Sequence, residues 1–440
     1  MRDAARPVAA ALLVALWVLQ EVLIAHGPST LPPWAPLGVL ALYGLAGFVV
    51  SRASIRLVTL FALGAAAALA VEFGIERSLL NGTRAAALFI AFLSTMQMLK
   101  VSIELGPGLE RVRREQEALG AREQHDAMLL RGWLMGSIFA AGTLAIVAPL
   151  VGPGRSSQAR RTLGQSALQG VGLALLWSPF FVAMAVCMRL SAGITLGAAL
   201  ANGLAMSALG LAISHAAFGG RLQAGWMKPL WRAFAASAAM ALGVVLIHRH
   251  WGLSNSEAIV AAVPLIALVM ARRAVLQAPR AVARQWFVSL EAIAGEALLV
   301  GASLIFGEVM KDLLAQGLVR LPDGLAAWPV PLLIVWPSLA MVALSVAGFH
   351  PIIGASVLFP LQSSLAVLHP VVAAGSVLTG WMLAILLSTF AVPVMFAASV
   401  FRVAAADLVT GAALRFGLMF APAAWLYLWI LNQMLGAAVP

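Results

Sequence analysis

Charged residues and cysteine are scarce in this chain of 440 residues. Only 10% of the residues are Asp, Glu, Lys or Arg, whereas an ordinary soluble domain has roughly 25%. The single cysteine, Cys187, excludes a disulfide framework and a cysteine cluster for a metal ion. No Gly-rich loop ending in Lys-Ser or Lys-Thr occurs, which argues against an ATP-driven motor within this chain. We therefore expect no cofactor and no resident metal site.

Long polar stretches are also missing, while long apolar runs are abundant. Hydrophobic residues make up 62% of the chain, and the longest polar stretch runs only from Glu104 to Arg131. Apolar runs of about 20 residues recur from end to end, each long enough to cross a hydrocarbon core of roughly 30 Å. The sequence predicts an all-α polytopic membrane protein, surrounded by the lipid bilayer of a bacterial-type inner membrane.

The net charge of +11 agrees with this membrane class. Basic residues in membrane proteins gather on cytoplasmic loops, so the charge does not require a nucleic-acid partner, and we expect none. The first apolar run follows Arg2 and Arg6 and lacks a small-residue cleavage site, so it is interpreted as a span rather than a signal peptide. The N-terminus is then cytoplasmic.

Threading the chain by its basic loops predicts eleven transmembrane helices and two re-entrant hairpins. The spans are expected at about 8–26, 35–51, 57–74, 84–103, 166–188, 193–214, 233–248, 256–271, 286–307, 371–398 and 408–435. Hairpins replace ordinary spans in two places, for different reasons.

The first hairpin is predicted at about 132–152. Arg131 precedes this run and Arg155 follows it, so both of its ends lie on the same face of the membrane. Its tip falls near Ala140–Thr143, with arms of about ten residues each, which are too short to span separately.

The second hairpin is predicted at about 329–366, inside a stretch without Lys or Arg. It contains "SVAGFHPIIGASVLFP", in which His350 and Pro351 interrupt an apolar run. Proline lacks an amide hydrogen, so the helix should break there. Free backbone groups in lipid must be sheltered by protein or by a water-filled cavity. The tip is therefore either a packed bend or part of a site.

Each hairpin is followed by a span that Ser and Pro interrupt. The first such span contains Ser178-Pro179 in "LLWSPFFVA", and the second contains Ser388-Thr389 and Pro393 in "LLSTFAVPVM". The predicted organisation is a first helix at 1–34, repeat 1 at 35–217 and an inverted repeat 2 at 218–440. Paired discontinuous helices are typical of secondary transporters, whose sites lie near the membrane midplane.

This order of elements resembles the ion transporter superfamily, in particular its divalent anion/sodium symporter branch. In that branch each hairpin tip carries Ser-Asn-Thr, whereas here the tips have Ala141-Gly142-Thr143 and Gly348-Phe349-His350-Pro351. The resemblance implies symport by an elevator motion against a dimeric scaffold, and hence a homodimer. Spans 1–4 and 7–9 would then contain the scaffold.

The broken elements would present backbone groups and hydroxyls to a small-molecule substrate. Half-helix N-termini favour an anion, which makes an organic anion the expected substrate class, and carbonyls with hydroxyls suit Na+ as a coupling ion. The predicted substrate and ion site consists of Gly142, Thr143, Ser178, Pro179, Gly348, His350, Pro351, Ser356, Ser388 and Thr389.

Several of these residues also have a structural interpretation. Serine and threonine in membrane helices often bond to their own backbone or to a neighbouring helix, and Pro179 or Pro351 could simply kink a helix. His350 could titrate near neutral pH and couple protons to transport, or donate one hydrogen bond that holds the tip together. Glu296, within the span at 286–307, is a second coupling candidate because carboxylates in hydrocarbon are often functional.

Two rival functions remain open at this stage. An integral-membrane enzyme acting on lipid-linked substrates would need a sizeable external loop with clustered catalytic side chains, and the predicted external loops are short. A membrane subunit of a binding-protein-dependent transporter would have a separate partner. The sequence specifies neither the substrate, nor Na+ or H+ as the coupling ion, nor the direction of transport.

Overall fold

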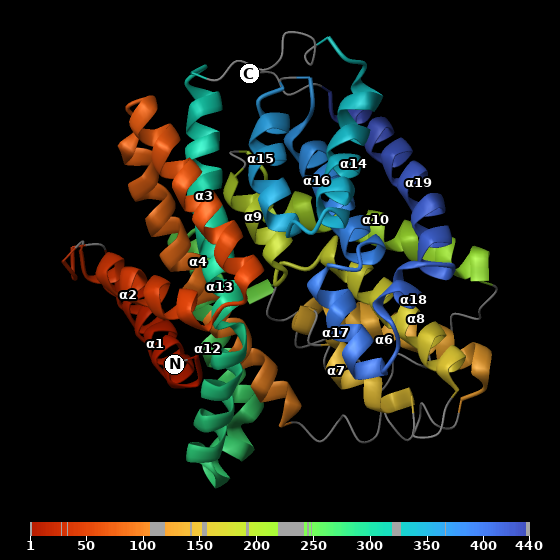
Figure 1. Cartoon of the computed structure of the whole chain (residues 1–440), viewed down its shortest axis with the longest axis horizontal. Coiled ribbons are helices and arrows are strands. Elements are labelled where there is room, and N and C mark those ends of the chain that lie inside the picture. The colour runs from red at the N-terminus through yellow and green to blue at the C-terminus, as the bar shows by residue number, and fades with distance from the viewer. Residues whose placement is uncertain are drawn as a thin grey trace. The chain divides into compact units, whose positions relative to one another are not determined.

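The computed structural model confirms the all-α class in the part of the chain that it describes (Figure 1). That part comprises residues 2–27, 29–32, 34–105, 119–140, 143–151, 156–190, 193–218, 242–243, 246–247, 249–318, 327–365 and 367–436, and it contains no strand. Among these residues, 8 helices are long and apolar enough to cross a membrane. The number of eleven spans stays a prediction.

The chain divides into two compact units, each made of two separate segments. Unit 1 comprises Met1–Gly106 and Ala239–Val319, and unit 2 comprises Pro107–Ala238 and Arg320–Pro440. The spans predicted at 8–103 and 256–307 fall in unit 1, while the span predicted at about 233–248 lies mostly outside the described residues.

Unit 1 is a bundle in which α13 contacts most of the other helices. Its described helices are α1 (Arg2–His26), α2 (Trp34–Val50), α3 (Ala53–Glu72), α4 (Glu76–Glu104), α12 (Asn255–Gln277) and α13 (Pro279–Ala315). Small residues let these helices approach closely: a Cβ added to Gly82 of α4 would lie 2.8 Å from Ile305 Cα of α13. Tyr43 of α2 is buried, and its hydroxyl donates to the Ala294 carbonyl at 2.5 Å. Close packing of small residues is how membrane helices associate.

Unit 2 contains both predicted hairpins and both predicted broken spans. Its described elements are α6 (Ala121–Phe139), α7 (Thr143–Val147), the 3-10 helix η2 (Ala148–Val151), α8 (Ser157–Leu175), α9 (Val182–Leu190), α10 (Leu196–Phe218), α14 (Val330–Val346), α15 (Pro351–Ser363), α16 (Pro370–Leu387), α17 (Val392–Phe401), α18 (Ala405–Val409) and α19 (Ala412–Leu435).

The first hairpin has a longer first arm than the sequence predicts. The expected arm of about ten residues from Gly132 is wrong, because α6 is a helix of 19 residues that begins at Ala121. The alternating charges of this polar stretch predicted a solvated or interfacial helix, yet Gln124, Asp126 and Arg131 are all buried. Hydropathy alone misreads such a segment, because partners inside the unit make burial of these polar groups tolerable.

Helices also end inside the segments predicted as the second hairpin and the two broken spans, while the re-entrant character of the hairpin stays a prediction. The arms α14 and α15 meet at residues 347–350, α8 gives way to α9 at 176–181, and α16 gives way to α17 at 388–391. The packing is crosswise: α7 contacts α17, α9 contacts α15, and α8 contacts α16 (Figure 1). The hairpins and the broken helices therefore interlock within one unit.

Candidate functional site

Ser178 connects the first helix break to the first hairpin. This residue follows α8, where the helical hydrogen bonds stop, and its side chain is fully buried. Its hydroxyl donates to the carbonyl of Ser137, in the last turn of α6. The same hydroxyl accepts a hydrogen bond from the Phe180 amide at 3.1 Å. One side chain thus holds the broken backbone and the hairpin arm together.

Ser388 makes the same connections in the second half of unit 2. Its hydroxyl donates to the Ser345 carbonyl at 2.6 Å, and the Phe390 amide donates to that hydroxyl at 3.2 Å. The Ser345 carbonyl lies in the last turn of α14 and also accepts from the Gly348 amide at 3.0 Å. Ser178 and Ser388 are therefore structural counterparts, as are Ser137 and Ser345.

The hairpin tips match in backbone conformation as well. Ala140 has φ +49° and Gly348 has φ +94°, and each follows its carbonyl-bearing serine by three residues. Only glycine adopts such angles at low cost. This correspondence pairs the first residue of α7, Thr143, with the first residue of α15, Pro351. Gly142 lies outside the described residues.

His350 forms the N-cap of α15. Its Nδ1 accepts a hydrogen bond from the Ile352 amide at 3.2 Å, so Nδ1 carries no hydrogen and Nε2 carries the ring hydrogen. The ring meets Trp381 of α16 edge-on, with centroids 6.4 Å apart. One expectation from the sequence is that His350 donates a hydrogen bond that holds the tip together. In the structure the His350 side chain accepts this bond instead. Nε2–H then remains a hydrogen-bond donor at the second hairpin tip.

His369 repeats this cap at the start of α16. The Val371 amide donates to His369 Nδ1 at 3.3 Å, and Pro370 follows the histidine as Pro351 follows His350. The sequence reasoning missed this second His-Pro pair. The dipeptide is itself a usable signal, because proline at the first helical position needs no hydrogen-bond partner and the preceding side chain can cap the next amide.

The remaining hydroxyls of the predicted site divide into two kinds. Ser356 is buried and donates to the Ile352 carbonyl of its own helix at 2.9 Å, which leaves it little to offer a ligand. Thr143 Oγ1 and Ser345 Oγ are buried without a partner among the described residues. An unpaired buried hydroxyl is costly, so these two atoms, one beside each tip, are the better candidate ligands.

The two helix breaks differ in exposure. Phe180 and Pro179 of the first break are buried, whereas Phe390 of the second break is 59% exposed and Thr389 is partly exposed. The N-cap of α17, Ala391, provides no side-chain hydrogen bond. The second break therefore presents uncapped helical amides next to an accessible surface, an arrangement that favours an anion.

Glu296 lies on α13 in unit 1, and its side chain is exposed. The positive charges of Arg52 and Lys100, in the same unit, interact with the Glu296 carboxylate. The hairpin tips belong to unit 2, so no single unit brings Glu296 together with them. Among the described residues, no group of three His, Cys, Asp or Glu side chains could hold a metal ion.

Comparison with solved structures finds similarity to a known transporter. The YdaH transporter from Alcanivorax borkumensis, whose crystal structure is described as revealing an unusual topology, superposes with a TM-score of 0.53. The similarity covers 88% of this chain and 99% of that one, at 13% sequence identity. No protein-family model matches the sequence, and no curated protein does either.

The class of protein follows from these observations. The chain is a multi-pass membrane protein with the fold of a transporter, since the similarity extends over nearly the whole of both chains. At this level of identity the likeness establishes the fold alone. The solute, its coupling ion and the motion must be argued from the residues of this chain.

Proposed function

We propose that this protein is a secondary active transporter for a small organic anion, coupled to Na+ or H+. Unit 2 would carry the substrate site, and unit 1 would act as the scaffold of a homodimer in an elevator-type cycle. These finer assignments, and membership of the ion transporter superfamily, rest on the hairpin and break motifs. The protein would lie in the inner membrane with a cytoplasmic N-terminus.

The observation that carries the proposal is the paired serine connection. Ser178 and Ser388 each tie a helix break to the hairpin that precedes it. Two interrupted helices and two tips thereby lie within one unit. Buried irregular backbone at membrane depth is tolerated where it lines a cavity, and transporters place their sites at such points.

The charge of the substrate is inferred from the helix ends. The N-termini of α9 and α17 follow the two breaks, and each carries roughly half a positive charge. Thr143 Oγ1 and Ser345 Oγ add two hydroxyls without partners among the described residues. These groups suit a carboxylate or similar anion, together with a small cation held by hydroxyl and carbonyl oxygens.

A thermal-shift screen of the purified full-length chain tests this proposal directly. Small mono- and dicarboxylates are added with and without Na+ at several pH values. We expect at least one carboxylate to raise the melting temperature, and expect the same compound to accumulate in proteoliposomes. A shift that requires Na+ assigns sodium coupling, and one that follows pH assigns proton coupling. Failure of every anion in both assays would contradict the transport of an organic anion.

His350 provides a residue-level test with a matched control. Asn can replace the capping function of His350, whereas Ala cannot and should cost about 1 kcal/mol of stability. If His350 moves protons, His350→Asn keeps the stability and loses the response of uptake to a pH gradient. The same two substitutions at His369, which caps the opposite end of α16 from the break, should change stability alone. Equal uptake by wild type and His350→Asn at every pH gradient would remove this residue from coupling.

A further inference from the structure

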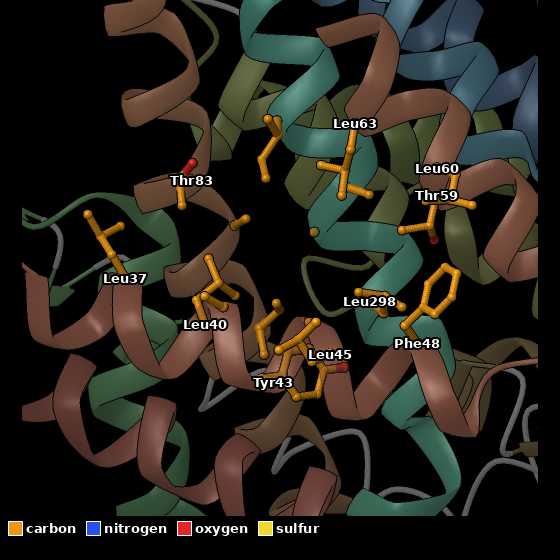
Figure 2. Close-up of a pocket in the computed structure, with 17 residues that line it drawn as sticks. Leu37, Leu40, Tyr43, Leu45, Phe48, Thr59, Leu60, Leu63, Thr83 and Leu298 are labelled. Atoms are coloured by element: carbon orange, nitrogen blue, oxygen red, sulfur yellow. The ribbon is translucent and has the colours of Figure 1, made fainter. Parts of the chain in front are cut away.

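An apolar cavity lies among α2, α3, α4 and α13 of unit 1 (Figure 2). Its volume is about 480 Å³, within the range of roughly 300–1,000 Å³ that is typical of sites for small molecules. Figure 2 shows Phe48, Thr59 and Leu298 on one side of the cavity, and Leu37 and Thr83 on the opposite side. The cavity belongs to a different unit from the hairpins, so the transport proposal does not account for it.

Three hydroxyl-bearing residues line the cavity, and two of them are already hydrogen-bonded. Tyr43 donates to the Ala294 carbonyl, and Thr83 donates to the Leu79 carbonyl at 2.6 Å. Thr59 Oγ1 has no partner among the described residues, although the side chain is only 2% exposed. A buried water needs two to four polar partners, which these walls do not supply. The occupant must therefore be mostly apolar, with one acceptor for Thr59.

The mouth of the cavity is also apolar. Leu45 and Leu60 line it and are 70% and 58% exposed. In a protein that crosses a membrane, exposed leucines on the spanning helices face acyl chains rather than water. The cavity is thus open to the hydrocarbon, from which an acyl chain can enter sideways.

A basic residue stands at the Thr59 end of the cavity. Arg56 precedes Thr59 by one turn, about 4.5 Å along the axis of α3. Its guanidinium lies over the ring of Phe48, 5.8 Å from the centroid, and Phe48 lines the cavity. Arg56 Nε donates to the Ser51 carbonyl at 3.2 Å, which leaves the two terminal amino groups for an anion.

We propose that this cavity binds an anionic phospholipid. One acyl chain would fill the cavity, an ester carbonyl would accept from Thr59, and the phosphate would lie against Arg56. Along α3 the apolar lining of the cavity is followed by the Thr59 hydroxyl and then by the Arg56 guanidinium. A phospholipid has its acyl chain, its ester and its phosphate in the same order. Basic residues at the membrane surface select anionic headgroups. The lipid belongs to the leaflet that meets the N-terminal end of α3.

Native mass spectrometry of the full-length chain tests this site. Delipidated protein is titrated with phosphatidylglycerol and, separately, with phosphatidylcholine carrying the same acyl chains. We expect one tightly bound phosphatidylglycerol per chain and a rise in melting temperature, with weaker binding of phosphatidylcholine. Equal binding of both lipids would contradict the role of Arg56.

A substitution that fills the cavity distinguishes lipid binding at this site from nonspecific lipid binding elsewhere on the protein. Gly44 lines the cavity, and a Cβ added there meets nothing within 4 Å, so Gly44→Leu fills the space without a clash at Cβ. Leucine also favours helix over glycine. Gly38→Leu is the matched control, because Gly38 is equally open on the same helix but lies outside the lining. We expect the plug to abolish tight lipid binding and the control to retain it.

Two further variants test the polar contacts. Arg56→Gln should weaken phosphatidylglycerol binding about fivefold and leave phosphatidylcholine binding unchanged, which is the loss expected for one basic residue near a membrane surface. Thr59→Val, which keeps the shape and removes the hydroxyl, should weaken both lipids. Lipid binding by Gly44→Leu at the wild-type level would overturn the proposal.

A second copy of this chain is the alternative occupant of the same face. It would be indicated if Gly44→Leu converted dimers to monomers while the bound lipid stayed, and that result would also overturn the proposal. If Gly44→Leu does not fold, Ala41→Leu on the same helix provides a second plug, because Ala41 also lines the cavity.

Discussion

At the scale of single residues, two short patterns decide the architecture of the candidate site. In "SPF" and in "STF" the serine hydroxyl bonds backward to a hairpin carbonyl and accepts from the phenylalanine amide two residues later. Proline stands inside the first break, at Pro179, but only in the first turn of α17 after the second break, at Pro393, so its position is not what the breaks share. The shared requirement is a small hydroxyl-bearing side chain that replaces the missing helical hydrogen bonds.

We expect opposite changes in stability when glycine is replaced by alanine at one hairpin tip and alanine by glycine at the other. Gly348→Ala should lower the stability by about 1–2 kcal/mol, because φ +94° is unfavourable for a side chain. Its Cβ would meet nothing within 4 Å, so the effect comes from the backbone alone. Ala140→Gly should raise the melting temperature, because the strain at φ +49° and ψ −130° exceeds the entropic cost of glycine. Thermal unfolding of both variants measures this, and shifts of the same sign would contradict it.

At the scale of elements, the broken helices are positioned by glycines at their crossings. A Cβ on Gly170 of α8 would lie 2.2 Å from the Leu129 carbonyl oxygen of α6. A Cβ on Gly380 of α16 would lie 2.7 Å from Ser338 Cα of α14. Both glycines come eight residues before their break serine. The close crossing is therefore a second feature that the two halves of unit 2 share.

Alanine at either crossing should force the helices apart. We expect Gly170→Ala and Gly380→Ala each to cost about 1–3 kcal/mol, the usual cost of overpacking a close contact. Gly197→Ala on α10 is the control, since its Cβ meets nothing within 4 Å and alanine favours helix. Thermal unfolding in detergent measures all three, and a loss at Gly197 equal to the others would show that the crossings are not responsible.

At the scale of the whole molecule, the basic loops predict which ends of the hairpins face the cytoplasm. Cysteine labelling tests this with little background, because the only native cysteine, Cys187, is buried. Gln158, at the start of α8, and Ser364, the C-cap residue of α15, are both exposed. We expect Gln158→Cys to react only from the cytoplasm and Ser364→Cys only from outside. Labelling of both from one side would show that the predicted threading is wrong.

Sequence patterns predicted helix interruptions in the segments where α14, α8 and α16 end, because the signals of an interruption are local. Proline and glycine weaken a helix at their own positions, and serine beside a break is recognisable without knowing its partner. The same reasoning failed at α6, where Gln124, Asp126 and Arg131 have the composition of a solvated or interfacial helix but are buried. Local composition cannot tell a solvated charge from one that is buried with partners.

By itself the sequence determined the all-α membrane class and the positions of the interruptions, because hydropathy and helix-breaking residues act over a few neighbouring positions. Tertiary structure alone decided that Ser137 and Ser345 supply the carbonyls for the break serines, which lie 41 and 43 residues further along the chain. It also decided that α2, α3, α4 and α13 leave an apolar cavity beside Arg56. Such contacts depend on which helices meet, and no short stretch of the chain encodes its distant partner.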